Sequence, residues 1–291
     1  MKIGQKLLSI FLAISMALSI TACGEKKKNS DSSTGDLTTT AASEITAEET
    51  TSESTTTSTS EEITKDLEKT VTIAGQEFDI ASKELRIMLN DYTYKYDYLD
   101  LSSISHFKDL ESLEISYSKE VFQPLYIFDY EGLSELKNLK KLTLRSAYFV
   151  KSKNDYTYNL EYINNMKSLK IIIFNDMFMD DWSFLNKINN VEEMTVFWSD
   201  LSTLDFLNSN TSIKKLTLEN TGIKNFDDVN SNLTIKNLDL SENWHLTDIT
   251  GVNKLKNIDY LYISTNDIDD LEQQVKKIKE DLPYCKLEVD D

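Results

Sequence analysis

A six-residue phrase, apolar-x-x-apolar-x-apolar, recurs through the last two thirds of the chain. Its second half alternates with the period of a short strand. The middle apolar residue of each phrase, called here the marker residue, is in seven clear copies Leu113, Leu142, Ile172, Met194, Leu216, Leu238 and Leu261. Successive marker residues are 29, 30, 22, 22, 22 and 23 residues apart, and a degenerate copy with Leu85 and Ile87 comes 28 residues before Leu113. This regular return predicts one structural coil per copy.

The segments between the phrases carry apolar residues at intervals of three, and a small polar residue follows each phrase. The spacing of three predicts a tight helical or 3-10 return arc that faces the same core as the strand. The polar residue, such as Ser199, Thr221 or Asn243, is suited to turn the chain and satisfy open backbone groups. A set of amphipathic helices would also give intervals of three. It does not explain why period-two triplets return at a fixed 22 residues.

The pattern resembles the leucine-rich-repeat family, L-x-x-L-x-L-x-x-N/T-x-L, from about Glu84 to Asp270. In its 22-residue form it is similar to the internalin-like surface proteins of Gram-positive bacteria. This resemblance implies an α/β solenoid with a concave parallel β-sheet and convex arcs that are 3-10, irregular or short helical segments. The chain departs from the family pattern where Ser, Thr or Met replaces the turn asparagine, and in its long early coils.

Both ends of the repeat array predict caps, which a solenoid needs to cover its terminal coils. The first cap, over about residues 70–90, includes a strand within Val71–Ser82. The second, over about residues 268–291, has helical spacing in Ile268–Asp281 and then a strand from Cys285 to Val289. The leucine-rich-repeat domain is therefore expected to span residues 70–291.

The N-terminal stretch predicts a secretion signal over residues 1–22. Lys2 and Lys6 precede an almost wholly apolar run, Leu7–Ile20, which is too short for a spanning helix. The sequence Ile-Thr-Ala-Cys that ends at Cys23 resembles the lipobox of bacterial lipoproteins. This resemblance implies that Cys23 is diacylated and holds the protein at the extracellular face of the cell membrane. A buried core helix is the alternative, but the polar tract that follows offers it no partner.

Residues 23–69 predict a disordered tether. From Asn29 to Thr64 there is no lysine, arginine or aromatic residue, and serine and threonine make up more than half of the segment. Such a composition buries too little apolar surface to offset the entropy of folding.

The chain is strongly acidic, with a formal net charge of −18 that becomes −20 when Lys2 and Lys6 leave with residues 1–22. This charge repels phosphate backbones and disfavours nucleic acid as a partner. The only cysteine besides Cys23 is Cys285, so the sequence predicts no intramolecular disulfide, and Cys285 is expected to be buried.

No catalytic pattern is found: the sequence lacks a glycine-rich phosphate loop, a metal-binding motif and a nucleophile elbow. We therefore expect neither enzymatic activity nor a cofactor. His106 and His245 are interpreted as structural or solvated, and the acid pairs Asp180-Asp181 and Asp227-Asp228 as solvated turns that could at most hold calcium weakly. An enzyme whose acids act together across neighbouring repeats is an alternative that the spacing does not support.

A contact site is expected where apolar side chains interrupt the polar concave surface. Ile171, Ile173, Phe197 and Trp198 cluster in the third and fourth repeats. The candidate binding residues are Arg145, Ile173, Asn175, Phe197, Trp198 and Glu219. The expected ligand is a protein, and a carbohydrate or cell-wall glycan is the alternative.

The long early coils are rich in aromatic residues, which give large contact area at low entropic cost. They are Phe122, Tyr126, Phe128 and Tyr130 in one insertion and Tyr148, Phe149, Tyr156 and Tyr158 in the next. These side chains either bind a ligand or pack on each other, and the sequence leaves both interpretations open.

Overall fold

The computed structural model describes residues 69–90, 98–118, 124–179, 181–232, 234–264 and 267–290. They belong to one compact unit, Thr64–Asp291. The predicted signal peptide, Cys23 and the tether lie outside the described residues. Among the helices of the described part, none is long and apolar enough to cross a membrane.

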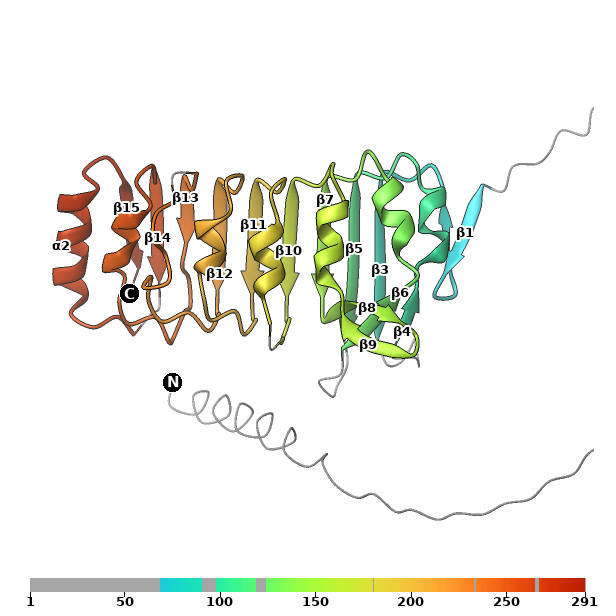
Figure 1. Cartoon of the computed structure of the whole chain (residues 1–291), viewed down its shortest axis with the longest axis horizontal. Coiled ribbons are helices and arrows are strands. Elements are labelled where there is room, and N and C mark those ends of the chain that lie inside the picture. The colour runs from blue at the N-terminus through green and yellow to red at the C-terminus, as the bar shows by residue number, and fades with distance from the viewer. Residues whose placement is uncertain are drawn as a thin grey trace, which may run out of the picture. The chain divides into compact units, whose positions relative to one another are not determined.

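The described residues contain a nine-stranded sheet in which every neighbouring pair is parallel (Figure 1). The sheet has one strand for each marker residue and a further strand at the C-terminal end. In spatial order its strands are β3 (Glu84–Asn90), β5 (Ser112–Ser118), β7 (Lys141–Arg145), β10 (Ile171–Asn175), β11 (Glu193–Phe197), β12 (Lys215–Glu219), β13 (Asn237–Asp239), β14 (Tyr260–Ser264) and β15 (Lys286–Asp290).

The strand register confirms the interpretation of the repeat. Marker residues pair with marker residues across the sheet, as Met194 does with Ile172 on one side and with Leu216 on the other. The degenerate copy pairs in the same way, since Leu85 lies opposite Leu113. Leu287 on β15 continues the column beyond Leu261, so the predicted cap strand is a further member of the same sheet.

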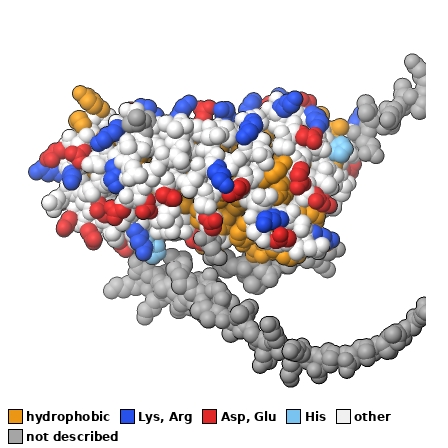
Figure 2. Space-filling model, viewed as in Figure 1, with side chains coloured by type: hydrophobic (Ala, Val, Ile, Leu, Met, Phe, Trp, Pro, Cys, Tyr) orange, Lys and Arg blue, Asp and Glu red, His pale blue; other side chains and the backbone are white. Residues whose placement is uncertain are grey.

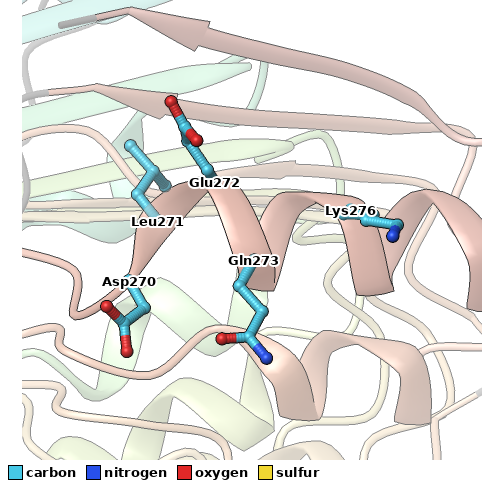
Figure 3. Close-up of a pocket in the computed structure, with 5 residues that line it drawn as sticks. All are labelled: Asp270, Leu271, Glu272, Gln273 and Lys276. Atoms are coloured by element: carbon cyan, nitrogen blue, oxygen red, sulfur yellow. The ribbon is translucent and has the colours of Figure 1, made fainter.

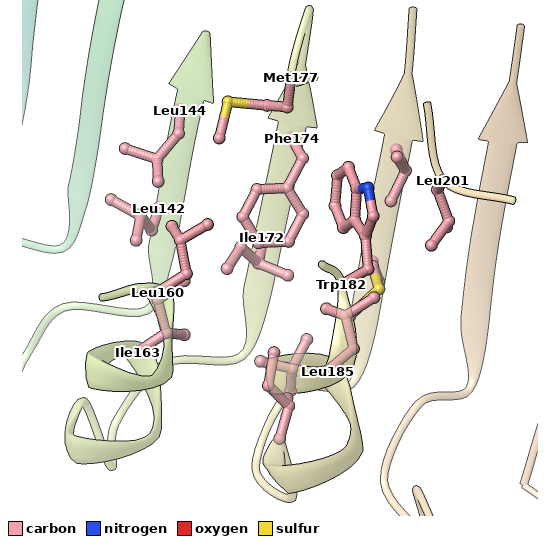
Figure 4. Packing of buried hydrophobic residues seen from close by; sticks show 14 of the residues in the cluster. Leu142, Leu144, Leu160, Ile163, Ile172, Phe174, Met177, Trp182, Leu185 and Leu201 are labelled. Atoms are coloured by element: carbon pink, nitrogen blue, oxygen red, sulfur yellow. The ribbon is translucent and has the colours of Figure 1, made fainter. Parts of the chain in front are cut away.

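The return arcs are 3-10 helices that pack on one face of the sheet (Figure 1). Those in the described part are η1 (Ser102–His106), η2 (Glu131–Glu135), η3 (Leu160–Asn165), η4 (Ser183–Lys187), η5 (Asp205–Asn208) and η6 (Thr250–Lys254). In Figure 4, Ile163 and Leu185 extend from two arcs toward the layer formed by the strand residues, with Ile172 among them. All three are fully buried, and each such side chain contributes about 1.5–3 kcal/mol relative to exposure.

Two buried asparagines replace apolar residues in the return arcs. Asn210 and Asn232 lie six residues before a marker residue, where other coils carry residues such as Phe107 or Leu255. Asn210 donates to the Ile188 carbonyl at 2.7 Å and accepts the backbone N–H groups of Ser212 and Ile213, both at 2.9 Å. Asn232 makes the equivalent bonds one coil later, with the Asn210 carbonyl as its acceptor at 3.2 Å. These asparagines satisfy buried backbone groups, a role that the apolar pattern did not indicate.

A left-handed residue ends the strand segment of each coil from β7 to β13. The residue four after the marker has a positive φ in Ser146, Asp176, Trp198, Asn220 and Glu242. Each donates its backbone N–H to a carbonyl of the next coil, as Trp198 does to Glu219 at 3.1 Å and Asn220 does to Ser241 at 3.1 Å. This conformation extends the pairing between coils beyond the strand while the chain turns back toward the arcs.

The long early coils form a second, smaller sheet, which decides between the two interpretations for half of their aromatic residues. It has the order β4 (Tyr98–Asp100), β6 (Leu125–Phe128), β8 (Ala147–Ser152) and β9 (Asp155–Tyr158). Four of the eight aromatics, Phe128, Tyr130, Tyr148 and Phe149, are buried. Self-packing therefore holds for these four, whereas Phe122 lies outside the described residues.

The remaining tyrosines of the insertions stay partly or largely accessible. Tyr126 lies 4.8 Å from Tyr156 between ring centroids, and Tyr148 stacks on Tyr158 at 4.9 Å. Tyr156 and Tyr158 are nevertheless exposed. Figure 2 shows hydrophobic side chains gathered over this second sheet.

The two ends of the described unit differ partly from expectation. The predicted N-terminal strand is an antiparallel hairpin, β1 (Thr70–Ile73) and β2 (Gln76–Asp79), because Ala74 and Gly75 both have positive φ and make a tight two-residue turn. At the other end α2 spans Leu271–Asp281 and begins three residues later than its apolar spacing suggested.

The described unit is a leucine-rich-repeat solenoid. The repeated register, the single parallel sheet and the 3-10 arcs on one of its faces all follow from the spacing of the marker residues.

Candidate binding surface

The face of the nine-stranded sheet opposite the 3-10 arcs is called here the open face. On each strand the residues that alternate with the buried ones point to it. Most are polar, and some form ion pairs along the surface, as Lys215 does with Glu193 at 3.9 Å. Arg86 and Glu114 form an ion pair of the same kind at 3.6 Å. A solvated face of this kind makes any apolar residues on it informative.

Three predicted residues, Ile171, Ile173 and Phe197, interrupt this polar face, and Trp198 follows Phe197 at the end of its strand. These four residues are called here the central patch. The isoleucines lie on β10, and Phe197 ends the adjacent strand β11. Ile173 pairs in register with Thr195, which places it diagonally from Phe197, within reach of an aromatic side chain. The two isoleucines and Phe197 are half-buried, and Trp198 is 51 % exposed.

Trp198 has an unusual backbone conformation for so large a side chain. Its φ is +50°, whereas the flanking coils carry Asp176 and Asn220 at the same position. The left-handed region costs an L-residue roughly 1–2 kcal/mol, and asparagine and aspartate tolerate it best. The strain is local, and the N–H bond to Glu219 holds the residue in place. Sequence spacing could have placed Trp198 in this column, but the positive φ itself was not predicted.

The other predicted binding residues surround the patch. Asn175 on β10 pairs in register with Phe197 on one side and with Arg145 on the other. Arg145 is exposed at the end of β7, and no ion pair involving it occurs within the described ranges. Glu219 on β12 is the register partner of Phe197 on its second side. The structure therefore brings these residues together along the ends of four adjacent strands.

Glu219 stands among other carboxylates. Burial raises the pKa of the Glu219 carboxyl, and repulsion from Glu242 and Asp239 raises that pKa further. Asp239 accepts the Ser241 backbone N–H at 3.0 Å and the Ser241 hydroxyl. Across the part of the chain that the structure covers, no lysine, arginine or histidine forms an ion pair with any of these three acids. This flank of the central patch carries uncompensated negative charge.

Tyrosines continue the open face beyond these acids. The Tyr260 hydroxyl donates to Glu288 at 2.6 Å, and the Tyr262 hydroxyl donates to Asp290 at 2.9 Å. The bond to Glu288, with a smaller effect of burial, raises the pKa of Tyr260 to about 12. Lys286 lies 5.4 Å above the Tyr260 ring. Both tyrosines thus already have polar partners on β15, and Tyr260 was not among the predicted binding residues.

The residues that sequence analysis set aside lie in solvated positions. His106 and His245 are exposed, and His106 Nδ1 lies 2.9 Å from the Ser103 carbonyl oxygen. Asp227 and Asp228 are exposed as well, while Asp180 lies outside the described residues. Within those residues no group of three or more His, Cys, Asp or Glu side chains is placed to hold a metal ion.

Cys285 is half-buried rather than buried, because it lies just before the terminal strand β15. Burial raises the pKa of its thiol, and the nearby Asp259 carboxylate raises that pKa further. A thiol of this kind is a poor nucleophile at neutral pH.

A surface hollow at the start of α2 offers no better site (Figure 3). It is lined by Asp270, Leu271, Glu272, Gln273 and Lys276, which are consecutive or nearly so at one helix end. A groove along one or two helical turns brings no convergent set of groups from separate elements.

No protein-family model matches the chain, and no curated protein matches it in sequence. Solved structures with a similar fold include an internalin C2 from Listeria monocytogenes. It is 16 % identical with a TM-score of 0.45, and the match covers 66 % of this chain and 80 % of that one. The leucine-rich-repeat domain of a type III effector is 15 % identical with a TM-score of 0.44, covering 72 % of this chain and 69 % of that one.

A leucine-rich-repeat protein from Leptospira interrogans is 18 % identical with a TM-score of 0.43, covering 64 % of this chain. The chain spans 50 % of the length of that protein. The strand register of this chain by itself establishes the leucine-rich-repeat fold.

Proposed function

We propose that this chain is a binding protein without catalytic activity, which engages a protein ligand through the central patch and is held by a lipid on Cys23 at the extracellular face of the cell membrane. A leucine-rich-repeat solenoid suits protein binding because its open sheet face presents side chains that the core does not need.

The observation that carries the proposal is Trp198. The flanking coils have aspartate or asparagine at this turn position. This coil instead has a half-exposed tryptophan in a strained conformation, next to Phe197 and near Ile173. Neither exposure nor strain helps the free chain to fold. Strained backbone concentrates at ligand contacts, and tryptophan is the residue most enriched among binding hot spots.

Glu219, Asp239 and Glu242 form an arrangement of the kind that the acid-catalysis alternative calls for. They stand on the open face of a sheet, and the hollow shown in Figure 3 lies elsewhere, at α2. A site that excludes water strengthens the electrostatic interactions that such catalysis uses, and an open sheet face does not exclude it. We therefore assign these acids to recognition.

The binding proposal is tested with Phe197→Ala/Trp198→Ala in a pull-down from envelope and host-cell fractions, followed by affinity measurement with the protein recovered by the unaltered chain. Hot-spot residues lose about 2 kcal/mol or more on truncation, so binding should weaken by about thirtyfold. Trp244→Ala is the matched control, since Trp244 is also exposed but lies outside the patch. Unchanged affinity of the double variant would refute the patch assignment.

The anchor proposal rests on the first 23 residues of the sequence. It is tested by growing cells with an alkyne-tagged fatty acid and detecting label on the protein. The unaltered chain and Cys285→Ser should carry label, and Cys23→Ser should not. Protease treatment of intact cells should release the repeat domain. Label on Cys23→Ser, or protection of the domain in intact cells, would contradict this part of the proposal.

Carbohydrate binding is a second candidate, favoured by the exposed Tyr156 and Tyr158 on the second sheet. Flat aromatic faces carry partial negative charge that attracts the polarised C–H groups of a sugar ring. A glycan array probed with the full chain and with Tyr156→Ala/Tyr158→Ala tests it. If the full chain binds no glycan, or if the double variant binds the same glycans equally well, carbohydrate binding at these tyrosines is ruled out.

A further inference from the structure

The acids beside the central patch indicate the chemistry of the partner. Phe197 and Glu219 are register partners on β11 and β12, so their Cα atoms stand about 5 Å apart, the ordinary spacing between strands. Asp239 lies on the following strand in register with Thr217, so Asp239 is diagonal to Glu219. Glu242 occupies the left-handed column two coils beyond Trp198. Apolar and anionic groups thus meet at one place on the open face.

Within the described residues, no cation neutralises these acids. Lys215 is on the same strand as Glu219, but it pairs with Glu193 at the opposite end of the strand. Lys286, on β15, pairs with Glu288. Arg145 is two strands from Phe197 on the side away from Glu219. Negative charges held together without a counter-ion produce a negative potential, which attracts a cation on a partner.

We propose that the partner presents a lysine or arginine next to the apolar residue that it places on the central patch, and that Glu219, Asp239 and Glu242 receive this cation. This inference rests on the proposed function, since it names the chemistry of the ligand for that same surface. The partner's apolar group covers Phe197 and Trp198 while its cation extends over β12 and β13. Arg145 on the other flank repels the cation, so the ligand binds in one direction along the solenoid.

The test begins with a phage-displayed library of random peptides, selected on the full chain and depleted of clones that also bind Phe197→Ala/Trp198→Ala. Retained peptides should combine an aromatic or aliphatic residue with a lysine or arginine a few positions away. Their affinities are then measured by fluorescence anisotropy against the full chain and its variants, at low and at high salt.

Glu219→Gln and Asp239→Asn should each weaken binding about two- to fivefold at low salt, and the difference should shrink as salt screens the charges. Glu193→Gln removes the same charge from the same face and should leave affinity unchanged, since Glu193 already has Lys215. Arg145→Gln should not weaken binding. Thermal melting of each variant identifies any loss of folding.

Retained peptides that are neutral or acidic would overturn the inference while leaving the proposed function in place. So would affinities of Glu219→Gln and Asp239→Asn that equal the affinity of the unaltered chain. Failure to retain any peptide that depends on Phe197 and Trp198 would instead count against the proposed function itself. The two proposals therefore fail by different results.

Discussion

Trp198 occupies on one coil the left-handed turn position that Asn220 occupies on the next, with φ values of +50° and +49°. Both donate their backbone N–H to the following coil at 3.1 Å. The backbone is therefore the same at the two positions, and only the side chain differs. Asparagine is sufficient for the turn that the fold needs. The turn therefore does not explain why this coil has tryptophan.

Replacement of Trp198 should show backbone strain directly. Trp198→Asn and Trp198→Val both remove the ring, but valine is β-branched and poorly suited to positive φ. The asparagine variant should be more stable than the valine variant by about 1–2 kcal/mol, a difference of several degrees in the midpoint of thermal unfolding for a domain of this size. Calorimetry on both variants measures this. Equal midpoints would mean that the turn relaxes and stores no strain.

Replacing Asn210 should destabilise the domain, even when the new residue is an apolar one of the kind found in other coils. Asn210→Leu leaves the Ser212 and Ile213 backbone N–H groups without their acceptor in a buried site. Each unsatisfied group costs about 1–3 kcal/mol, so both Asn210→Leu and Asn210→Ala should lower the free energy of unfolding by about 2–4 kcal/mol. Urea denaturation measures the loss. Asn208→Ala, at an exposed neighbour, should cost less, and equal losses would contradict this interpretation.

Shared ion pairs should give the domain an acid-sensitive component of stability. Glu192 receives Lys214 at 2.8 Å and Lys170 at 3.1 Å, and hydrogen bonds from these lysines lower the pKa of its carboxyl. A pKa lower in the folded than in the unfolded state stabilises the fold above the unfolded pKa, and this contribution is lost as pH falls through the folded pKa.

Glu192→Gln should therefore lower the midpoint of thermal unfolding slightly at neutral pH and leave it unchanged in strong acid. Because all three side chains are exposed, the difference is small. Melting curves over a range of pH measure it, with Glu84→Gln, on the edge strand β3, as control. A Glu192→Gln deficit that persists in strong acid would show that packing, not charge, is responsible.

Glu219 should behave in the opposite sense. Its raised pKa means that the folded state binds the proton more tightly than the unfolded state, so its contribution becomes less favourable as pH rises through the unfolded and then the folded pKa. Glu219→Gln should therefore slightly raise the thermal midpoint near neutral pH. The same variant should weaken binding of a basic peptide and remove part of its pH dependence, because protonation of Glu219 abolishes the attraction.

Both effects are measured on one preparation, by melting curves and by anisotropy across a pH series. As pH is lowered, the affinity of the unaltered chain should begin to fall at a higher pH than a glutamate of ordinary pKa would give. A variant that is less stable and binds equally well would contradict both expectations for Glu219.

The sequence predicted the solenoid because the marker residues obey a simple geometric rule. Every marker from Leu85 to Leu261 is buried and lies in one register column, and the spacing alone determines this. The positions of Phe197 and Trp198 on the surface followed from the same rule. The positive φ of Trp198 did not, since a turn residue is normally recognised by its being small or polar.

The second sheet was beyond the reach of pattern analysis. Its strands β4, β6 and β8 have three to six residues and carry aromatics on both faces, so they show no clear alternation. Asn210 and Asn232 were missed for a related reason, since a polar residue in an apolar column reads as an interruption. The carboxylates of Glu219, Asp239 and Glu242 come from two neighbouring coils, and only the register brings them together.

The second sheet also constrains how the molecule can change in length. Tyr98, Tyr126 and Tyr148 are register partners in that sheet, so the first coils are joined twice, once through each sheet. Deleting or duplicating one of these coils would break both sets of pairs. The 22-residue coils that follow are joined through one sheet and contact only their neighbours. Gene duplication can therefore lengthen the surface beyond the central patch while the early coils remain fixed in number.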